Sequence, residues 1–399
     1  MSKHLRISAL CASLLLAVPV LAQSPASSPM QVLHSAAELE QYLKAGANPL
    51  DAFTPYGRRD FLRGLTWGTR GLGGISPQAI QRELTADQAR AVARLFGAES
   101  YIQQIIQALD QTPPLRLPEP SATLERRYLD MQTKLNAMDK EADATDNITQ
   151  RNFQPLIAHY LQAHATELAQ LDRLSTSDLA LLFDGFTSLA GASLDEQVIA
   201  QQQKVYAQLR ARQLDTRRGL DDNLLKPLMN LRMFDAIAQL QAQYPSLHSV
   251  KLPQVEDKLG ENFVGRSVYR YEPDGNRLVR EEFGFASGKQ LLMVVGEGCH
   301  FSRDAMARLS SDAGFAQLAR DAHVVMLTPP ASAAPTLMLR LWNRAHPEWP
   351  IQVASNRSEW REIDAPGVPI FYVFENGKLI HREQGWRGEA TLAALKKRL

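Results

Sequence analysis

The sequence predicts a multidomain α+β protein, with a mainly α-helical N-terminal region and an α/β domain at its C-terminal end. The chain has 399 residues, which is long for a single core and favours two or three domains. Capped helical segments dominate as far as about residue 250. Beyond that point, short apolar runs separated by glycine and proline indicate buried strands.

The composition is that of a globular protein without a strong charge. Hydrophobic residues make up 45% of the chain, charged residues make up 22%, and the formal net charge is +1. A balance of this kind gives no reason to expect nucleic acid or an anionic membrane as a partner.

The first 22 residues have the pattern of a signal peptide. Lys3 and Arg6 precede the almost continuously apolar stretch 7–22, and small residues stand near its end. The alternative is an uncleaved membrane anchor, but the apolar stretch is short for a spanning helix. We therefore expect residues 1–22 to be removed and the mature protein to be periplasmic, without stable membrane insertion.

Cleavage would also change the number of cysteines in the mature chain. It would remove Cys11 and leave Cys299 as the single cysteine of the mature chain. An exported chain with one cysteine has no internal disulfide. The thiol of Cys299 is then either buried and inert, or reactive toward other molecules.

Residues 23–110 are predicted to form a first helical domain, in which Ser35 and Thr85 are expected N-caps. Within it, the stretch 47–74 mixes glycines with arginines and aromatic residues. Such a stretch could be a contact surface, but the pattern favours a helix with a solvated arginine face and a buried aromatic face.

A stiff, extended linker is expected at residues 111–120, which contain four prolines. Residues 121–250 return to helical patterns and predict a bundle or an α-solenoid. The segment 231–245 resembles the end of a tetratricopeptide-like helix pair, although no 34-residue period runs through the region. This helical region could bind a protein partner or serve only in packing.

The C-terminal domain is expected at residues 260–399. Its predicted elements are an antiparallel hairpin at 268–271 and 277–280, buried strands at 290–295, 323–327 and 370–374, a helix that begins at Cys299, a strand at 379–381 and a closing helix at 388–399. The arginine-rich segment 340–344 is expected to be a helix in an insert, with Trp342 and Trp349 as core or groove-lining residues.

Two motifs in this domain resemble the thioredoxin-like superfamily. One is Cys299-His300-Phe301-Ser302 after a strand, and the other is Gly367-Val368-Pro369-Ile370-Phe371, followed by Asn376-Gly377. The resemblance covers about 140 residues (260–399) and implies a cis peptide bond before Pro369, with that proline against Cys299. It also implies binding positions around these motifs, namely Gly298, Phe301, Gly367 and Val368.

The predicted catalytic residues are Cys299, His300, Ser302 and Pro369. Backbone N–H groups and the helix dipole favour a thiolate at a helix N-terminus, and a protonated His300 would add positive charge. A thiolate attacks a disulfide and forms a mixed disulfide. Ser302 could donate a hydrogen bond to that thiolate.

Three departures from thioredoxin itself argue against dithiol chemistry. Ser302 replaces the cysteine that would resolve a mixed disulfide, and a hydroxyl cannot do so. Gly298 stands where a tryptophan normally precedes the cysteine, and Met293 stands where a buried acid helps proton transfer.

Three functions remain open. The first is monothiol exchange through Cys299 with exported proteins or small thiols, in a motif that resembles the Cys-Arg-Phe-Ser of a thiol-retention protein of the endoplasmic reticulum. The second is a redox-inactive binding module beside a helical partner-binding region. The third is an iron–sulfur cluster held with glutathione, as in monothiol glutaredoxins, but His300 replaces the required glycine. We expect no cofactor, and the nine histidines show no metal-ligand spacing.

Overall fold

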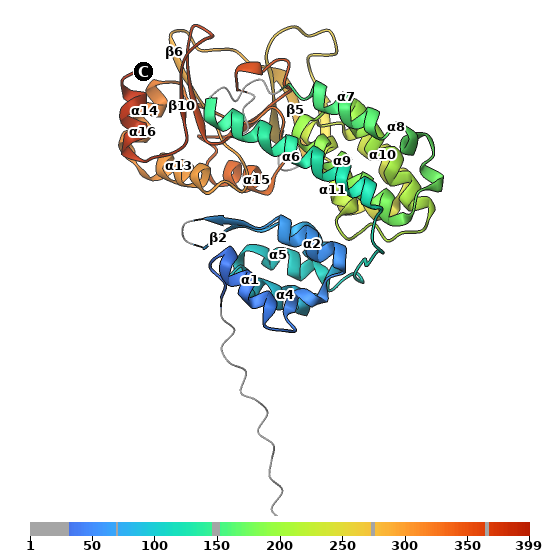
Figure 1. The fold of residues 1–399 in the computed structure, drawn as a ribbon. Helices are drawn as coiled ribbons and strands as arrows, with labels where there is room; N and C mark the ends of the chain where they lie inside the picture. Colours follow the sequence, from blue (N-terminus) through green and yellow to red (C-terminus); the bar gives the residue numbers. More distant parts are fainter. Residues whose placement is uncertain (1–31, 69–70, 146–151, 273–275, 364–366) are drawn as a thin grey trace, which may run out of the picture.

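The computed structural model describes residues 32–68, 71–145, 152–272, 276–363 and 367–399. The predicted signal peptide, Cys11 and the tip of the hairpin expected around 273–275 lie outside these residues. Within them the chain is mainly helical at first and then forms a C-terminal α/β domain, as the sequence predicts (Figure 1). No helix in the described part of the chain is both long enough and apolar enough to cross a membrane.

The first helical unit is built around its own apolar core. Phe61, Ile80 and Leu95 are completely buried there, and the expected caps Ser35 and Thr85 accept backbone N–H groups of the helices that they begin. The elements of the unit are α1 (Ala36–Lys44), a 3₁₀ turn (Pro49–Ala52), α2 (Pro55–Arg63), β1 (Thr66–Gly68), β2 (Gly71–Gly74), α3 (Pro77–Glu83), α4 (Ala86–Leu95) and α5 (Glu99–Leu109).

The stretch 47–74 is only partly the helix that we expected. Its middle part forms α2, whose Arg59 and Arg63 make ion pairs with Glu125 of the second unit; Arg59 also pairs with Glu119 of the linker. Its end forms the antiparallel hairpin β1–β2 instead. Glycine is the poorest helix former after proline, which explains why the glycine-rich end leaves the helix.

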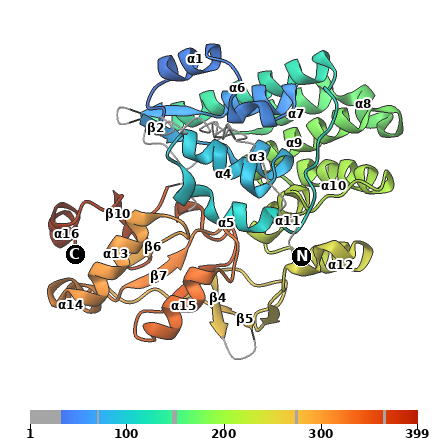
Figure 2. The same ribbon diagram turned by 90° about the horizontal axis from the view of Figure 1, so that it is seen from below.

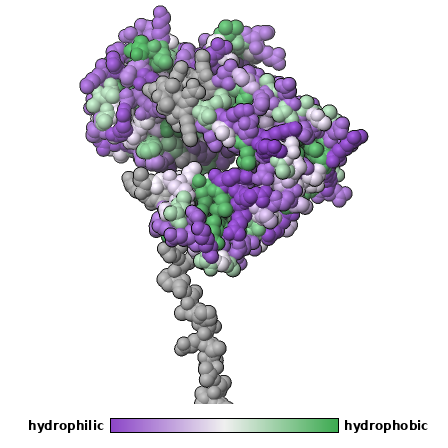
Figure 3. Space-filling view, viewed as in Figure 1, coloured by the Kyte–Doolittle hydropathy of each residue, from purple (hydrophilic) through white to green (hydrophobic). Residues whose placement is uncertain are grey.

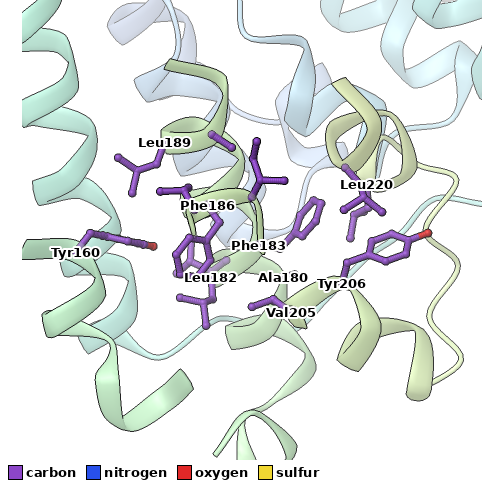
Figure 4. Packing of buried hydrophobic residues seen from close by; sticks show 14 of the residues in the cluster. Tyr160, Ala180, Leu182, Phe183, Phe186, Leu189, Val205, Tyr206 and Leu220 are labelled. Atoms are coloured by element: carbon purple, nitrogen blue, oxygen red, sulfur yellow. The ribbon is translucent and has the colours of Figure 1, made fainter. Parts of the chain in front are cut away.

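The second helical unit contains the largest apolar core (Figure 4). Phe183 and Phe186 of α9 meet Tyr160 and Tyr206 from the neighbouring helices, and Gly185 lets Tyr160 pass, since a Cβ there would lie 1.9 Å from its hydroxyl. The helices are α6 (Ala122–Thr145), α7 (Gln154–Ala163), α8 (Ala165–Ala169), α9 (Thr176–Ser193), α10 (Glu196–Ala211), α11 (Leu220–Asn230) and α12 (Phe234–Gln243), with 3₁₀ turns at Leu171–Arg173 and Pro245–Ser249.

Two buried arginines connect the first unit to the second. Arg82 of α3 makes a two-pronged ion pair with Asp184 of α9, at 2.6 and 2.7 Å. Arg218, which is 2% exposed, donates to main-chain carbonyls only, namely those of Gln81, Leu84, Leu109, Thr112 and Pro113. The linker between the units is thus bound along its start rather than solvated.

The C-terminal domain is built on an eight-stranded mixed sheet among the described residues, in the order β10-β9-β6-β7-β8-β4-β5-β3. β6 runs parallel to β7 and antiparallel to β9. The strands are β3 (Gln254–Asp257), β4 (Ser267–Glu272), β5 (Arg277–Glu282), β6 (Lys289–Val294), β7 (Val325–Thr328), β8 (Ile351–Ala354), β9 (Ile370–Glu375) and β10 (Lys378–Gln384). The helices are α13 (His300–Ser311), α14 (Ala313–Asp321), α15 (Leu337–Ala345) and α16 (Glu389–Lys396), with a 3₁₀ turn at Arg361–Ile363.

Alternation along the strands divides the domain into two apolar layers. Leu291 and Met293 of β6 face one layer, into which α13, α14, α15 and α16 all pack. Leu292 and Val294 face the other, which is closed by Trp360 and Ile363. The sheet therefore holds the start of α13 in a fixed place at the end of β6.

One loop connects the helical region to this domain. Arg232 has a left-handed backbone (φ 56°) between α11 and α12 and so separates these two helices. Arg232 is 9% exposed, and its guanidinium donates to the carbonyls of Pro330, Ser332, Ala354 and Ser355. Phe234 packs against both the second helical core and the core of the C-terminal domain.

Candidate functional site

Cys299 lies where β6 passes into α13. It is the N-cap residue of α13, and its carbonyl accepts the backbone N–H of Arg303 at 3.2 Å. The buried strand places the cysteine at the sheet end, and the helix begins there because Gly296 to Gly298 interrupt the apolar run. Cys299 is half-buried at this point, and its side chain makes no capping hydrogen bond to the first helical turn.

The proline loop meets this cysteine, as the two motifs predict. The peptide bond between Val368 and Pro369 is cis. The thiol of Cys299 lies 3.0 Å from the carbonyl oxygen of Val368 and donates to it. Residues 69 positions apart in the chain are thus in direct contact.

Glycine is required at two points of this contact. Gly298 has a φ of 80°, a left-handed conformation that a tryptophan at this place could adopt only with strain. Gly296 allows the proline loop to approach, since a Cβ there would lie 2.7 Å from Val368. Gly367 stands before Val368, and a Cβ on it would lie 3.2 Å from the Gln384 side chain.

The other motif residues divide into exposed and buried ones. His300 and Phe301 are exposed on α13 and their rings lie together, with centroids 3.8 Å apart. Ser302 is completely buried, and its hydroxyl accepts the backbone N–H of Gly296 at 3.3 Å. This hydrogen bond of Ser302 therefore helps to hold the turn that precedes Cys299.

An apolar groove of about 660 Å³ begins beside the cysteine. Gly298 and Met306 line its α13 side, and Leu337, Leu341 and Trp342 line its α15 side. Trp342 is fixed by an indole N–H bond to the carbonyl of Trp349, at 2.7 Å. The sequence identifies Trp342 as core or groove-lining. The apolar spacing of α15 could have indicated an amphipathic face, but not that α13 lies opposite.

Sequence reasoning also missed several parts of the domain. The strand β8, the parallel strand β3 and a second cis peptide bond, at Ala334–Pro335, have no strong local signal. Met293, in the place of a buried acid, is completely buried. Among the described residues there is no group of three or more metal-ligating side chains that could hold an ion.

The strand order, the cysteine at the start of α13 and the cis-proline beside it give the C-terminal domain a thioredoxin-like fold. No protein-family model matches the chain, and no curated protein matches it.

Solved structures of thioredoxin-like proteins are similar to part of the chain. One in the oxidized form has 20% identity over 34% of this chain and 88% of its own, with a TM-score of 0.24. The exposed lipoprotein thioredoxin of Streptococcus pneumoniae has 15% identity over 33% and 99%, with a TM-score of 0.24. A thioredoxin-like protein from Bacteroides caccae has 14% identity over 71% and 95%, with a TM-score of 0.23.

Proposed function

We propose that this is an exported thioredoxin-fold protein that exchanges disulfides through the single thiol of Cys299. The observation that carries the proposal is the position of this thiol, which is half-buried at the start of α13 and beside the cis-proline. Partial access lets a disulfide approach. The attack on that disulfide is made by the thiolate form of the sulfur.

The exchange has two steps. The thiolate of Cys299 attacks one sulfur of a client disulfide, so that a mixed disulfide forms and the second client sulfur leaves as a thiolate. A thiol from outside the protein then attacks the mixed disulfide and releases Cys299, because Ser302 cannot supply a second sulfur. In the net reaction the external thiol takes the place of one client sulfur in the disulfide, that client sulfur is released as a thiol, and the number of disulfides is unchanged.

The second candidate is a binding module in which the thiol does not react. The hydrogen bond from the Cys299 thiol to the Val368 carbonyl favours this reading, because only the protonated thiol can donate it. Exchange requires that bond to break, and the two candidates therefore differ in the reactivity of a single sulfur.

Alkylation of Cys299 by iodoacetamide at neutral pH tests the proposal. The Cys299→Ser variant serves as the blank, and it also corrects for Cys11 in any chain that keeps residues 1–22. We expect the folded protein to be labelled at least as fast as the same protein unfolded in urea. Labelling that occurs only after unfolding would overturn the proposal in favour of the binding module.

A further inference from the structure

One arginine of the helical region is enclosed by the C-terminal domain. Arg232 stands between α11 and α12, and Figure 2 shows these two helices beside that domain. Its guanidinium donates to two carbonyls of the loop 329–336, which leads from β7 to α15, and to two carbonyls at the end of β8. The surface in Figure 3 is mostly hydrophilic, whereas Arg232 is buried, so its position calls for a specific reason.

The loop 329–336 carries the hold of Arg232 to the start of α15. The bonds from Arg232 fix the carbonyls of Pro330 and Ser332. The loop then passes into α15 at Thr336, whose hydroxyl accepts the backbone N–H of Leu339 at 3.2 Å. Leu339 is completely buried in the apolar layer that α15 covers. The first turn of α15 is therefore fixed between the sheet and Arg232.

The first turn of α15 is bonded in its turn to the segment before Cys299. The carboxylate of Glu297 accepts the backbone N–H of Met338 at 3.2 Å. Met338 is the second residue of α15, where backbone N–H groups have no partner within the helix and a negative charge is favourable. Glu297 lies in the turn 296–298, two positions before Cys299. A shift of α15 would therefore pull on this turn.

The turn 296–298 determines where the thiol of Cys299 lies. The backbone N–H of Cys299 donates to the carbonyl of Gly296 at 3.4 Å, and the N–H of Gly296 donates to the Ser302 hydroxyl at 3.3 Å. Gly296 also lies against Val368, whose carbonyl accepts the thiol. A continuous series of contacts thus runs from Arg232 to the sulfur of Cys299.

We infer that Arg232 is a positioning residue for Cys299, because it holds the loop 329–336 and, through α15 and Glu297, the turn that presents the thiol. The inference rests on the proposed exchange and gives the helical region a part in it. Arg232 does not touch the reacting atoms. If Arg232 served in packing alone, its replacement would lower stability without a specific effect on the thiol, and this difference can be measured.

The reaction of the native full chain with dithiodipyridine at neutral pH tests the inference. The Cys299 thiolate attacks one sulfur of this disulfide and a mixed disulfide forms. The other sulfur departs, takes up a proton and becomes thiopyridone, whose absorbance gives the rate. Cys299→Ser is the blank, and circular dichroism with urea denaturation shows that each variant is folded in the assay.

Two changes at Glu297 isolate the link to α15. Glu297→Gln removes the charge but keeps an oxygen that can accept the Met338 N–H, whereas Glu297→Ala removes both. Glu297 is exposed, so the fold should tolerate either change. We expect Glu297→Ala to react about threefold more slowly than Glu297→Gln, because the turn loses its bond to α15.

Changes at Arg232 test the other end of the path. We expect Arg232→Met to slow the reaction about threefold, and Arg232→Lys, which keeps the charge and three donors, to recover part of the loss. Arg218→Met is the matched control. Arg218 is also buried and also donates to main-chain carbonyls, but these belong to residues 81–113. Arg218→Met should lose stability and keep the wild-type rate.

Combined variants show whether Arg232 and Glu297 act along one path. The effect of Arg232→Met should be about threefold in the Glu297→Gln background and nearly absent in the Glu297→Ala background, because independent effects would multiply. If Arg232→Met does not fold, Arg232→Lys takes its place in the same comparison.

The outcomes separate the two proposals. No reaction of the wild type would contradict the exchange itself. A wild type that reacts, with equal rates for Glu297→Ala and Glu297→Gln, would leave the exchange in place and overturn the inference. An equal effect of Arg232→Met in both backgrounds, or an equal loss of rate in Arg218→Met, would overturn it as well.

Discussion

The side chains that connect the two helical units and those of Cys299, His300 and Phe301 in the C-terminal domain lie in opposite surroundings. In the helical region, Asp184 and Arg218 are buried, the side chain of Arg82 is 11% exposed, and each of the three has partners that hold it. In the C-terminal domain, His300 and Phe301 are exposed and Cys299 is half-buried. The difference indicates that the first set stabilises the fold, whereas the second set is available to other molecules.

The largest effect is expected from breaking the Arg82–Asp184 pair. Asp184→Asn keeps the shape of the side chain and leaves the buried Arg82 without its counter-charge. We expect a loss of about 3–5 kcal/mol in the free energy of unfolding, measured by urea denaturation. The double variant Arg82→Met/Asp184→Leu should lose much less, because no charge is left buried alone.

The exposed pair Asp87–Arg90 provides the control. Asp87→Asn should change the free energy of unfolding by less than about 1 kcal/mol. An equal effect of Asp87→Asn and Asp184→Asn would remove the contrast between buried and exposed pairs.

A smaller effect is expected from acid. His164, at the end of α7, is 1% exposed, neither of its ring nitrogens has a hydrogen-bond partner in the described structure, and its ring lies against Tyr160. Burial lowers the pKa of His164 from 6.5 to about 4, although Glu167 opposes the shift. As the pH falls, His164 is therefore protonated in the unfolded chain before it is protonated in the folded protein. The free energy of unfolding, which has its full contribution from His164 above pH 6.5, declines as the pH falls toward 4.

We expect His164 to account for about 1–3 kcal/mol of this decline. Urea denaturation at neutral and acidic pH, compared between the wild type and His164→Phe, measures it. The variant should lose less stability on acidification, and an unchanged loss would mean that other groups govern the acid response.

The smallest effect on stability is expected from a change at Gly298. This variant also tests the position of the Cys299 thiol. Gly298→Ala places a Cβ on a left-handed residue and should lower the free energy of unfolding by about 1–2 kcal/mol. Gly260 has a similar φ of 76° and equally open surroundings, so Gly260→Ala is the matched control. Only Gly298→Ala should also alter the rate of Cys299 alkylation by more than about twofold, because it displaces the start of α13. Equal labelling of both variants would show that the conformation at Gly298 does not position the thiol.

The sequence predicts those parts of the molecule whose signal is local. The apolar run of β6 and the cysteine after it follow from the local sequence, the resemblance to the thioredoxin-like superfamily implies the cis bond before Pro369, and the structure contains all three. Arg218 and Arg232 could not be found in this way. Their partners are main-chain carbonyls, which every residue has, and they lie as much as 137 and 123 positions away.

The groove was predictable only in part for the same reason. One wall, α15, has an apolar spacing that can be read along the sequence, but the opposite wall comes from α13, after which α14 and β7 intervene. Which faces meet is decided by packing on the sheet. Nothing in either helix alone specifies it.

The position of Arg232 has a consequence for the modularity of the chain. Its guanidinium lies among carbonyls of the C-terminal domain, two of which belong to the loop that leads from β7 to α15. A thioredoxin-like unit excised at residue 260 would leave those carbonyls without their donor. Recombination that moved this domain into another protein would have to carry Arg232 and α12 with it. The segment that must move together is therefore longer than the thioredoxin-like domain itself.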